Sequence, residues 1–291
     1  MSEPQDTARE VSRWSPLHWL QKITGPWDRS NLFSMLRFIA IIFFVKGCVI
    51  DQYSIPSGSM EPTLHGDPRF GRGDRVLVNK WLFGPRIPFT AIRLWDWQEP
   101  KRWDIVVFEP VAGTSEYPVL IKRVAGLPGE RVRITGGKLE VNGQVVPFPE
   151  AMPKEMHYFN DLDLLKLSWE HPADAKAIQQ LRERYPLRYG VLEQDQFAVV
   201  PPEHYFVLGD NSFESVDGRV NGWIPRDNLH GRAFAVWWPF GRRRDFTGFS
   251  HTWWGWALML GVPLLLIGLD MWSTRRDRRR RAAAASGEGN A

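Results

Sequence analysis

Short alternating runs of β-branched and aromatic residues, separated by turn residues, dominate the middle of the chain. The runs are Arg75–Lys80, Asp104–Phe108, Val119–Ala125, Arg131–Thr135, Lys138–Val141, Phe197–Val200, Tyr205–Leu208 and Ala233–Trp238. Runs of this kind are typical of β-strands. Gly136-Gly137 and Asn142-Gly143 lie between successive runs and supply the positive φ angles that two-residue hairpins need. The pattern predicts a mainly β fold with an antiparallel sheet.

A polar stretch interrupts the β pattern at residues 149–196, which are rich in Glu, Lys, Leu and Gln. Within it, Ala173–Arg184 is the best candidate for a helix outside the membrane. We therefore expect a polar, partly helical insertion in the β domain.

A long apolar segment follows the β region at Trp253–Trp272. It has about the 20 residues that a helix needs to cross a bilayer core. Tryptophans lie at both ends, and six arginines follow between positions 275 and 281. Because such residues favour the cytoplasmic side, we expect a transmembrane helix over 250–272 and a basic cytoplasmic tail over 273–291.

A weaker apolar segment precedes the β region at residues 32–50 and contains Arg37 and Lys46. It can span a membrane only if both side chains reach the interfaces, and a helix lying in the interface is the alternative. We expect an uncleaved transmembrane anchor. With both segments spanning, residues 1–31 and the tail are cytoplasmic, and residues 51–249 lie on the periplasmic, extracytoplasmic side of the inner (plasma) membrane.

Composition and charge narrow the classes of partner. The formal net charge is +4, and the positive excess lies in the C-terminal arginines next to an apolar segment, which favours membrane lipids over nucleic acid. Cys48 is the only cysteine, so an intrachain disulfide is excluded. The scattered histidines form no metalloprotease motif, and we expect neither a metal nor a cofactor.

An aromatic stretch lies between Lys80 and Trp103 and includes Trp81, Trp95 and Trp97. Aromatic and basic residues in alternation favour contact with a membrane surface. The alternative is that these aromatic residues close one end of the β core.

Two residues far apart in the sequence are candidates for nucleophilic chemistry. Ser59 lies in a loop stiffened by Pro56 and Pro62, although Pro, Gly and Ser are common in any turn. Lys122 shares a predicted strand face with apolar neighbours, and burial there lowers a lysine pKa toward the range of a general base. Taken alone, the position of Lys122 favours a surface lysine at a strand edge.

Three segments together resemble the motifs of bacterial type I signal peptidases: Pro56–Leu64, Lys122–Glu130 and Gly209–Arg219. The resemblance implies a signal-peptidase-like antiparallel β-sheet catalytic domain. In that family the matching residues act as nucleophile (Ser59), general base (Lys122), hydroxyl donor of the oxyanion hole (Ser57, with the Ser59 N–H) and lysine-orienting serine (Ser215). The resemblance also implies a supporting Asp217–Arg219 ion pair with Asp210 nearby. Gly218 departs from the family, where many members have serine.

The implied function is a membrane-bound serine endopeptidase that removes N-terminal signal peptides from exported preproteins after small residues. Its expected partners are signal peptides, membrane lipids and the protein export machinery. Two alternatives stay open: a Ser/Lys protease dedicated to one substrate, and an inactive membrane scaffold with the same fold. The membrane segments disfavour the cytoplasmic self-cleaving Ser/Lys repressors, and the lysine disfavours a histidine-dependent signal peptidase.

Overall fold

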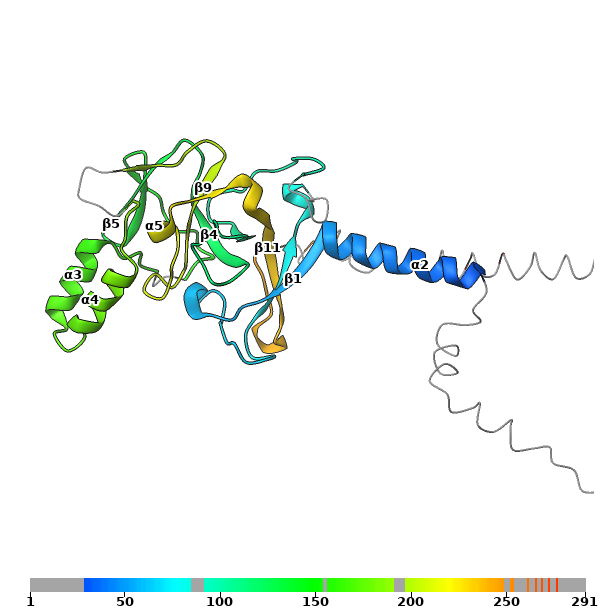
Figure 1. Ribbon diagram of the computed structural model, residues 1–291, viewed down its shortest axis with the longest axis horizontal. Helices are drawn as coiled ribbons and strands as arrows, with labels where there is room; N and C mark the ends of the chain where they lie inside the picture. Colours follow the sequence, from blue (N-terminus) through cyan, green and yellow to red (C-terminus); the bar gives the residue numbers. More distant parts are fainter. Residues whose placement is uncertain are drawn as a thin grey trace, which may run out of the picture.

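A long helix projects from one end of a β body in the computed structural model (Figure 1). The structure describes residues 29–84, 92–153, 156–190 and 197–248, with isolated positions after residue 251. The helix α2 spans Arg29–Phe44, a π-helical turn η2 continues it over Val45–Val49, and strand β1 begins directly at Ile50. Helix and sheet are therefore joined without a linker.

The larger sheet contains eight of the described strands in the order β1-β2-β11-β3-β4-β9-β10, with β12 paired to β11. Its strands are β1 (Ile50–Ser54), β2 (Arg75–Asn79), β3 (Ile105–Phe108), β4 (Leu120–Gly126), β9 (His204–Leu208), β10 (Trp223–Pro225), β11 (Leu229–Trp238) and β12 (Arg244–Asp245). All pairings are antiparallel. Short 3₁₀ turns occur at η3 (Gly58–Met60), η4 (Trp81–Phe83), η5 (Arg226–Asn228) and η6 (Phe240–Arg242), and a short helix α5 at Gly218–Asn221.

The smaller sheet contains four of the described strands in the order β7-β6-β5-β8. They are β5 (Arg131–Thr135), β6 (Lys138–Val141), β7 (Gln144–Val145) and β8 (Ala198–Val199). The predicted hairpin turns are present: Gly137 has φ 78° between β5 and β6, and Asn142 has φ 52° between β6 and β7. The mainly antiparallel β prediction is confirmed.

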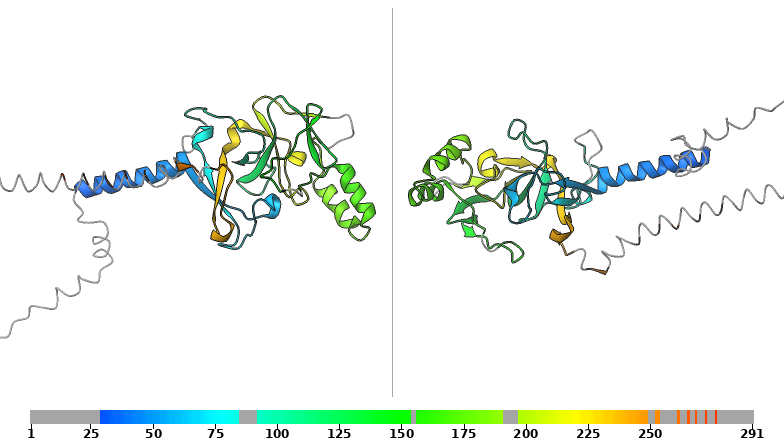
Figure 2. Two further views of the ribbon diagram at one scale, coloured as in Figure 1. Left: turned by 180° about the vertical axis from the view of Figure 1, so that it is seen from behind. Right: turned by 90° about the horizontal axis from the view of Figure 1, so that it is seen from below.

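The insertion forms two helices, α3 (Asp161–Glu170) and α4 (Ala175–Arg184). They lie at the opposite end of the body from α2 in every view (Figures 1 and 2). Helix α4 agrees with the predicted helix, whereas α3 was not predicted. It begins at a capping box in which the Asn160 side chain accepts from the Asp163 N–H and the Asp163 side chain accepts from the Asn160 N–H.

The strands that the sequence did not predict are short or polar. In β1, exposed and partly buried positions alternate because it is the edge strand of the sheet. Strands β7 and β12 contain two residues each and β10 three. Runs this short carry too little alternation to separate them from loops.

Apolar clusters fill the body on both sides of the central strands. One contains Ile55, Met60 and Leu64 packed on strands β2, β3 and β11. A second packs Val106, Val124 and Leu229 under the other part of the larger sheet. A third lies between β9 and the smaller sheet. The first cluster matters most for the site, because it holds both sides of the loop that carries Ser59.

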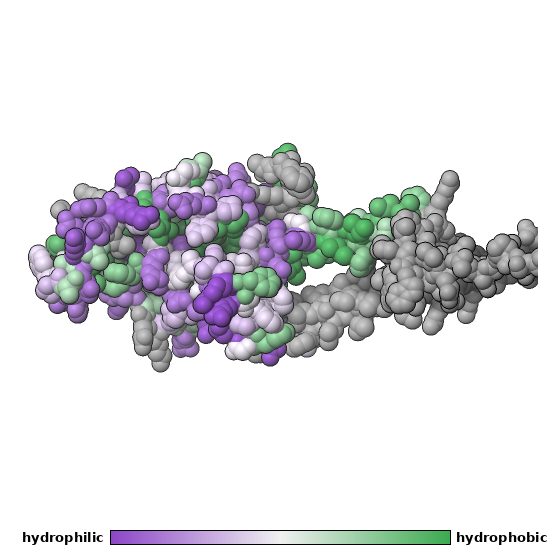
Figure 3. Space-filling model, turned by 60° about the horizontal axis from the view of Figure 1, so that its bottom comes forward, coloured by the Kyte–Doolittle hydropathy of each residue, from purple (hydrophilic) through white to green (hydrophobic). Residues whose placement is uncertain are grey.

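Helix α2 has an exposed apolar surface. Phe33, Phe38 and Phe43 are among its exposed side chains, and Figure 3 shows hydrophobic residues gathered along it. Among the described residues, however, no helix combines the length and hydropathy required for a membrane span. The predicted segment 250–272 lies outside the described residues apart from isolated positions.

Candidate active site

Ser59 lies in the short turn η3, which buried apolar residues fix on both sides. Ile55 before it and Met60 and Leu64 after it are at most 2 % exposed and belong to one core cluster. Ser59 itself is 7 % exposed. The apolar anchors on both sides of Ser59 therefore hold its largely buried hydroxyl in one place.

Lys122 points at this hydroxyl from strand β4. Its Nζ lies 2.5 Å from Ser59 Oγ, and the side chain is 3 % exposed. The pKa of Lys122 is lowered from 10.5 to about 8, mainly by burial. The carboxylates of Asp217 and Asp210 oppose this shift, and the Arg219 guanidinium adds a smaller lowering. A substantial neutral fraction near pH 8 allows this amine to accept the Ser59 proton.

The two other serines differ in their surroundings. The exposed Ser57 places its hydroxyl 3.5 Å from Ser59 Oγ, on the same loop. Ser215 is buried, and its Oγ has no hydrogen-bond partner among the described residues. The oxyanion role of Ser57 and the lysine-orienting role of Ser215 stay predictions.

A buried ion pair lies within the loop Gly209–Arg219, which packs against the Ser59 turn. Arg219 Nε donates to Asp217 Oδ1 at 2.9 Å, and Arg219 also donates to Ser212 Oγ and to the Phe159 carbonyl. Asp217 Oδ2 accepts from the Gly209 N–H at 2.8 Å. Burial acts to raise the pKa of Asp217, but the adjacent guanidinium and these hydrogen bonds outweigh it and lower the pKa below its usual value. Asp217 and Arg219 thus form a buried ion pair, and its supporting role stays a prediction.

A second buried ion pair links two of the three motifs, and sequence reasoning did not assign it. Arg123 donates to both carboxylate oxygens of Asp210, at 2.8 and 2.5 Å, and to the Trp103 carbonyl at 2.8 Å. Because Arg123 directly follows Lys122, this bidentate contact fixes β4 against the loop that begins at Gly209. A second charged residue inside an apolar strand was the available signal.

The Gly209 loop approaches Ser59 closely. The Asn211 N–H donates to the Ser59 carbonyl at 3.1 Å. A Cβ at Gly209 would lie 2.6 Å from that carbonyl oxygen and 2.1 Å from Ser215 Oγ. Only glycine therefore allows the two loops to pack at this distance.

A hollow of about 380 Å³ leads to the dyad. It is lined by residues 52–57, Ser59, Val107 and residues 117–122. Its walls are mostly apolar. Among the described residues, no group of His, Cys, Asp and Glu is arranged to hold a metal ion.

The chain is similar to proteins of one known family. Residues 29–238 match the family model described as "Signal peptidase, peptidase S26". The chain is 34% identical over 232 residues to signal peptidase I of Pseudomonas aeruginosa, covering 75% of this chain and 76% of that protein. It is 32% identical to the Pseudomonas fluorescens enzyme with the same coverage. A solved signal peptidase I from Enterococcus faecalis is 26% identical and covers 46% of this chain and 97% of that one, with a TM-score of 0.30.

Proposed function

Because this chain belongs to the signal peptidase family, peptidase S26, we propose that its type I signal peptidase activity uses Ser59 as nucleophile and Lys122 as general base. The enzyme is a serine protease that removes signal peptides from preproteins. The observation that carries the assignment of residues is the 2.5 Å approach of Lys122 Nζ to Ser59 Oγ in a buried setting.

The proposed reaction has two halves. Neutral Lys122 takes the hydroxyl proton as Ser59 Oγ attacks the scissile carbonyl, and the resulting ammonium then protonates the leaving amine. The acyl group, which is the signal peptide, stays on Ser59. Lys122, neutral again, takes a proton from water as the water oxygen attacks the ester carbonyl. The resulting ammonium returns this proton to Ser59 Oγ as the bond between Oγ and the acyl carbon breaks, which releases the signal peptide with a free carboxyl group and restores Ser59 and Lys122.

In both halves of the reaction a negative charge develops on the carbonyl oxygen, and hydrogen-bond donors must stabilise it. The Ser59 N–H and the Ser57 hydroxyl are the proposed pair, supported by their position on one loop beside the dyad. Loss of one such donor costs about 3 to 4 kcal/mol of transition-state stabilisation in other enzymes. Ser215 is proposed to orient the amine, and the Asp217–Arg219 and Arg123–Asp210 pairs hold the loop that carries it.

The proposed substrate lies extended in the hollow, with small residues one and three positions before the cut. The apolar walls support this preference. General processing of exported preproteins is the favoured assignment. A protease dedicated to one substrate would have the same dyad, and an inactive scaffold would have no reason to keep Lys122 buried at an energetic cost of about 3 kcal/mol.

The enzyme is further proposed to be held in the inner membrane by residues 32–50 and 250–272. Both termini would then be cytoplasmic and residues 51–249 periplasmic, next to membrane lipids and the export machinery. The exposed apolar side chains of α2 support the first anchor. The second rests on the sequence alone.

The pH dependence of cleavage tests the general base. Lys122 must be neutral to accept a proton, and its pKa is about 8. We therefore expect kcat/KM to rise about tenfold for each pH unit below pH 8 and to level off above pH 8. The measurement is kcat/KM for a preprotein with an Ala-x-Ala site between pH 5 and 10. A midpoint near 6.5 would point to a histidine, and a pH-independent rate would remove Lys122 from the mechanism.

The aromatic stretch is proposed to rest on the bilayer beside the anchor. Phe83 is fully buried and closes the β core, but Trp97 is 63% exposed. The Trp81 ring lies 4.4 Å from Trp95, 5.4 Å from Trp97 and 6.3 Å from Phe44 of α2, measured between centroids. The cluster therefore extends the apolar surface of the helix onto the body.

Spin labelling of the full chain in bilayers tests this contact. In a Cys48→Ser background, a label at Trp97→Cys is expected to be accessible to oxygen and shielded from an aqueous nickel complex. The control is Trp169→Cys, because Trp169 is 72% exposed and lies on α3 at the far end of the body. Equal nickel accessibility at both positions would contradict membrane contact by the aromatic cluster.

A further inference from the structure

The hollow has a direction relative to the anchor helix. Its wall at residues 52–57 follows β1, which begins at Ile50 directly after the helical segment. Figure 1 shows β1 running from the α2 end of the body toward the turn that carries Ser59. If the function proposed above holds, the membrane-embedded signal peptide enters from the α2 end. The residues after the cut then leave past the other side of Ser59.

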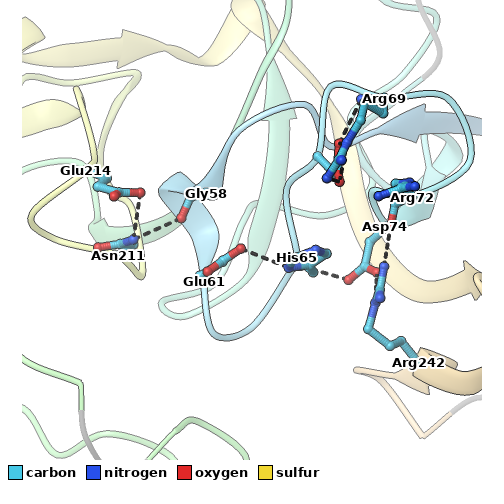
Figure 4. Close-up of polar contacts among 10 residues, drawn as sticks. Gly58, Glu61, His65, Arg69, Arg72, Asp74, Asn211, Glu214 and Arg242 are labelled. Atoms are coloured by element: carbon cyan, nitrogen blue, oxygen red, sulfur yellow. Dashed lines mark hydrogen bonds and ion pairs between the residues drawn. The ribbon is translucent and has the colours of Figure 1, made fainter.

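Two carboxylates from different loops converge beside Gly58, outside the hollow. A Cβ at Gly58 would lie 2.9 Å from Glu214 Oε2 and 3.8 Å from Glu61 Oε1. Gly58 directly precedes the nucleophile, and neither Glu61 nor Glu214 lines the hollow used by the signal peptide. Figure 4 shows both side chains flanking this part of the Ser59 loop.

The position of these carboxylates is tied to the nucleophile loop. Asn211 Nδ2 donates to the Gly58 carbonyl at 3.2 Å and to Glu214 Oε2 at 3.3 Å (Figure 4). Glu61 Oε1 lies 2.9 Å from Nδ1 of His65, which follows on the same loop. Within the described ranges, neither carboxylate forms an ion pair with a lysine or arginine. Their negative charge is therefore available to a passing peptide.

We propose that Glu61 and Glu214 determine specificity for the first residues of the mature protein. Two carboxylates beside the scissile bond repel an acidic residue that follows the cut and attract a basic one, because like charges brought together oppose binding. The repulsion and the attraction both act on residues after the cut. The preference for small residues before the cut is determined by the hollow.

Matched preproteins test this proposal in the full-length enzyme. They differ only by Lys, Gln or Glu at the first two positions of the mature part, and kcat/KM is measured for each. The wild-type enzyme is expected to prefer Lys over Glu by about tenfold, and the preference should shrink as salt screens the charges. In the Glu61→Gln/Glu214→Gln double variant the Lys-to-Glu ratio is expected to fall toward one.

The control variant is Glu116→Gln, which removes the same charge from the exposed loop at the other end of the hollow. It should keep the wild-type ratio. Because each ratio is taken within one enzyme, a lower amount of folded double variant does not affect it. A wild-type ratio near one, or an unchanged ratio in the double variant, would overturn the inference while cleavage of the Gln substrate upheld the proposed function. Failure of the wild type to cleave the Gln substrate would overturn both.

Discussion

Replacing Ser59 with alanine is expected to lower kcat/KM for preprotein cleavage by about 10⁴-fold or more, and replacing Lys122 with methionine by a similar factor. The first change removes the attacking oxygen, which lies 2.5 Å from the amine. The second keeps an unbranched apolar stem in the same buried site and removes only the group that accepts the proton. The effects should not add in the double variant, because nucleophile and base act as one unit.

The same preprotein assay provides the control. Lys138→Met makes the identical substitution at an exposed position in β6 and is expected to leave cleavage within about twofold of wild type. Circular dichroism and the unfolding midpoint should confirm that the Ser59 and Lys122 variants are folded. Retention of more than a few per cent of activity by Lys122→Met would mean that another group takes the serine proton.

Replacing Arg219 with methionine is expected to lower the free energy of unfolding by about 3 to 5 kcal/mol. Arg219 is 1% exposed, and the change leaves the carboxylate of Asp217 buried without its partner while removing the bonds to Ser212 and the Phe159 carbonyl. Because the pKa of Asp217 is lowered in the folded protein, this stabilisation is present above about pH 4 and is lost as the pH falls below it.

Denaturant titration in detergent measures this loss. Arg69→Met is the matched control, since the Arg69 side chain is 67% exposed in its ion pair with Asp67 and its replacement should change stability much less. Adding Asp217→Asn to the Arg219 variant should recover part of the stability, because the unpaired buried charge is then gone. Equal effects of the Arg219 and Arg69 changes would show that the buried pair does not brace the site.

The sequence predicted the parts of the fold whose pattern is local. Strands such as β4 and β9 combine β-branched residues with flanking glycine or proline, and both are present. Strand β1 escaped prediction because its role as an edge strand depends on β2, which lies more than 20 positions further on. Helix α3 escaped because its apolar positions are weakly periodic, and its start is defined by the Asn160 cap rather than by a hydrophobic stripe.

In the candidate site, too, the sequence predicted residues that belong to local motifs and missed contacts that depend on the packing of distant segments. Ser59 and Lys122 were singled out from motif chemistry, and the fold brings them together although they are 63 positions apart. The bidentate contact of Arg123 with Asp210 was not predicted, because the sequence of a strand does not reveal that both of its faces are buried or which distant carboxylate meets an arginine on it. Glu61 and Glu214 were missed for a related reason: their proximity to Gly58 depends on the packing of two separate loops.

The measurement that tests the central claim most directly is the mapped cleavage of an Ala-x-Ala preprotein by the purified full-length enzyme and by its Ser59→Ala variant. We predict a single cut by the wild type immediately after the second alanine, identified by the mass and N-terminal sequence of the product, and no product from the variant. Wild-type enzyme that leaves the preprotein intact, or a Ser59→Ala variant that still cuts at the same bond, would contradict the account.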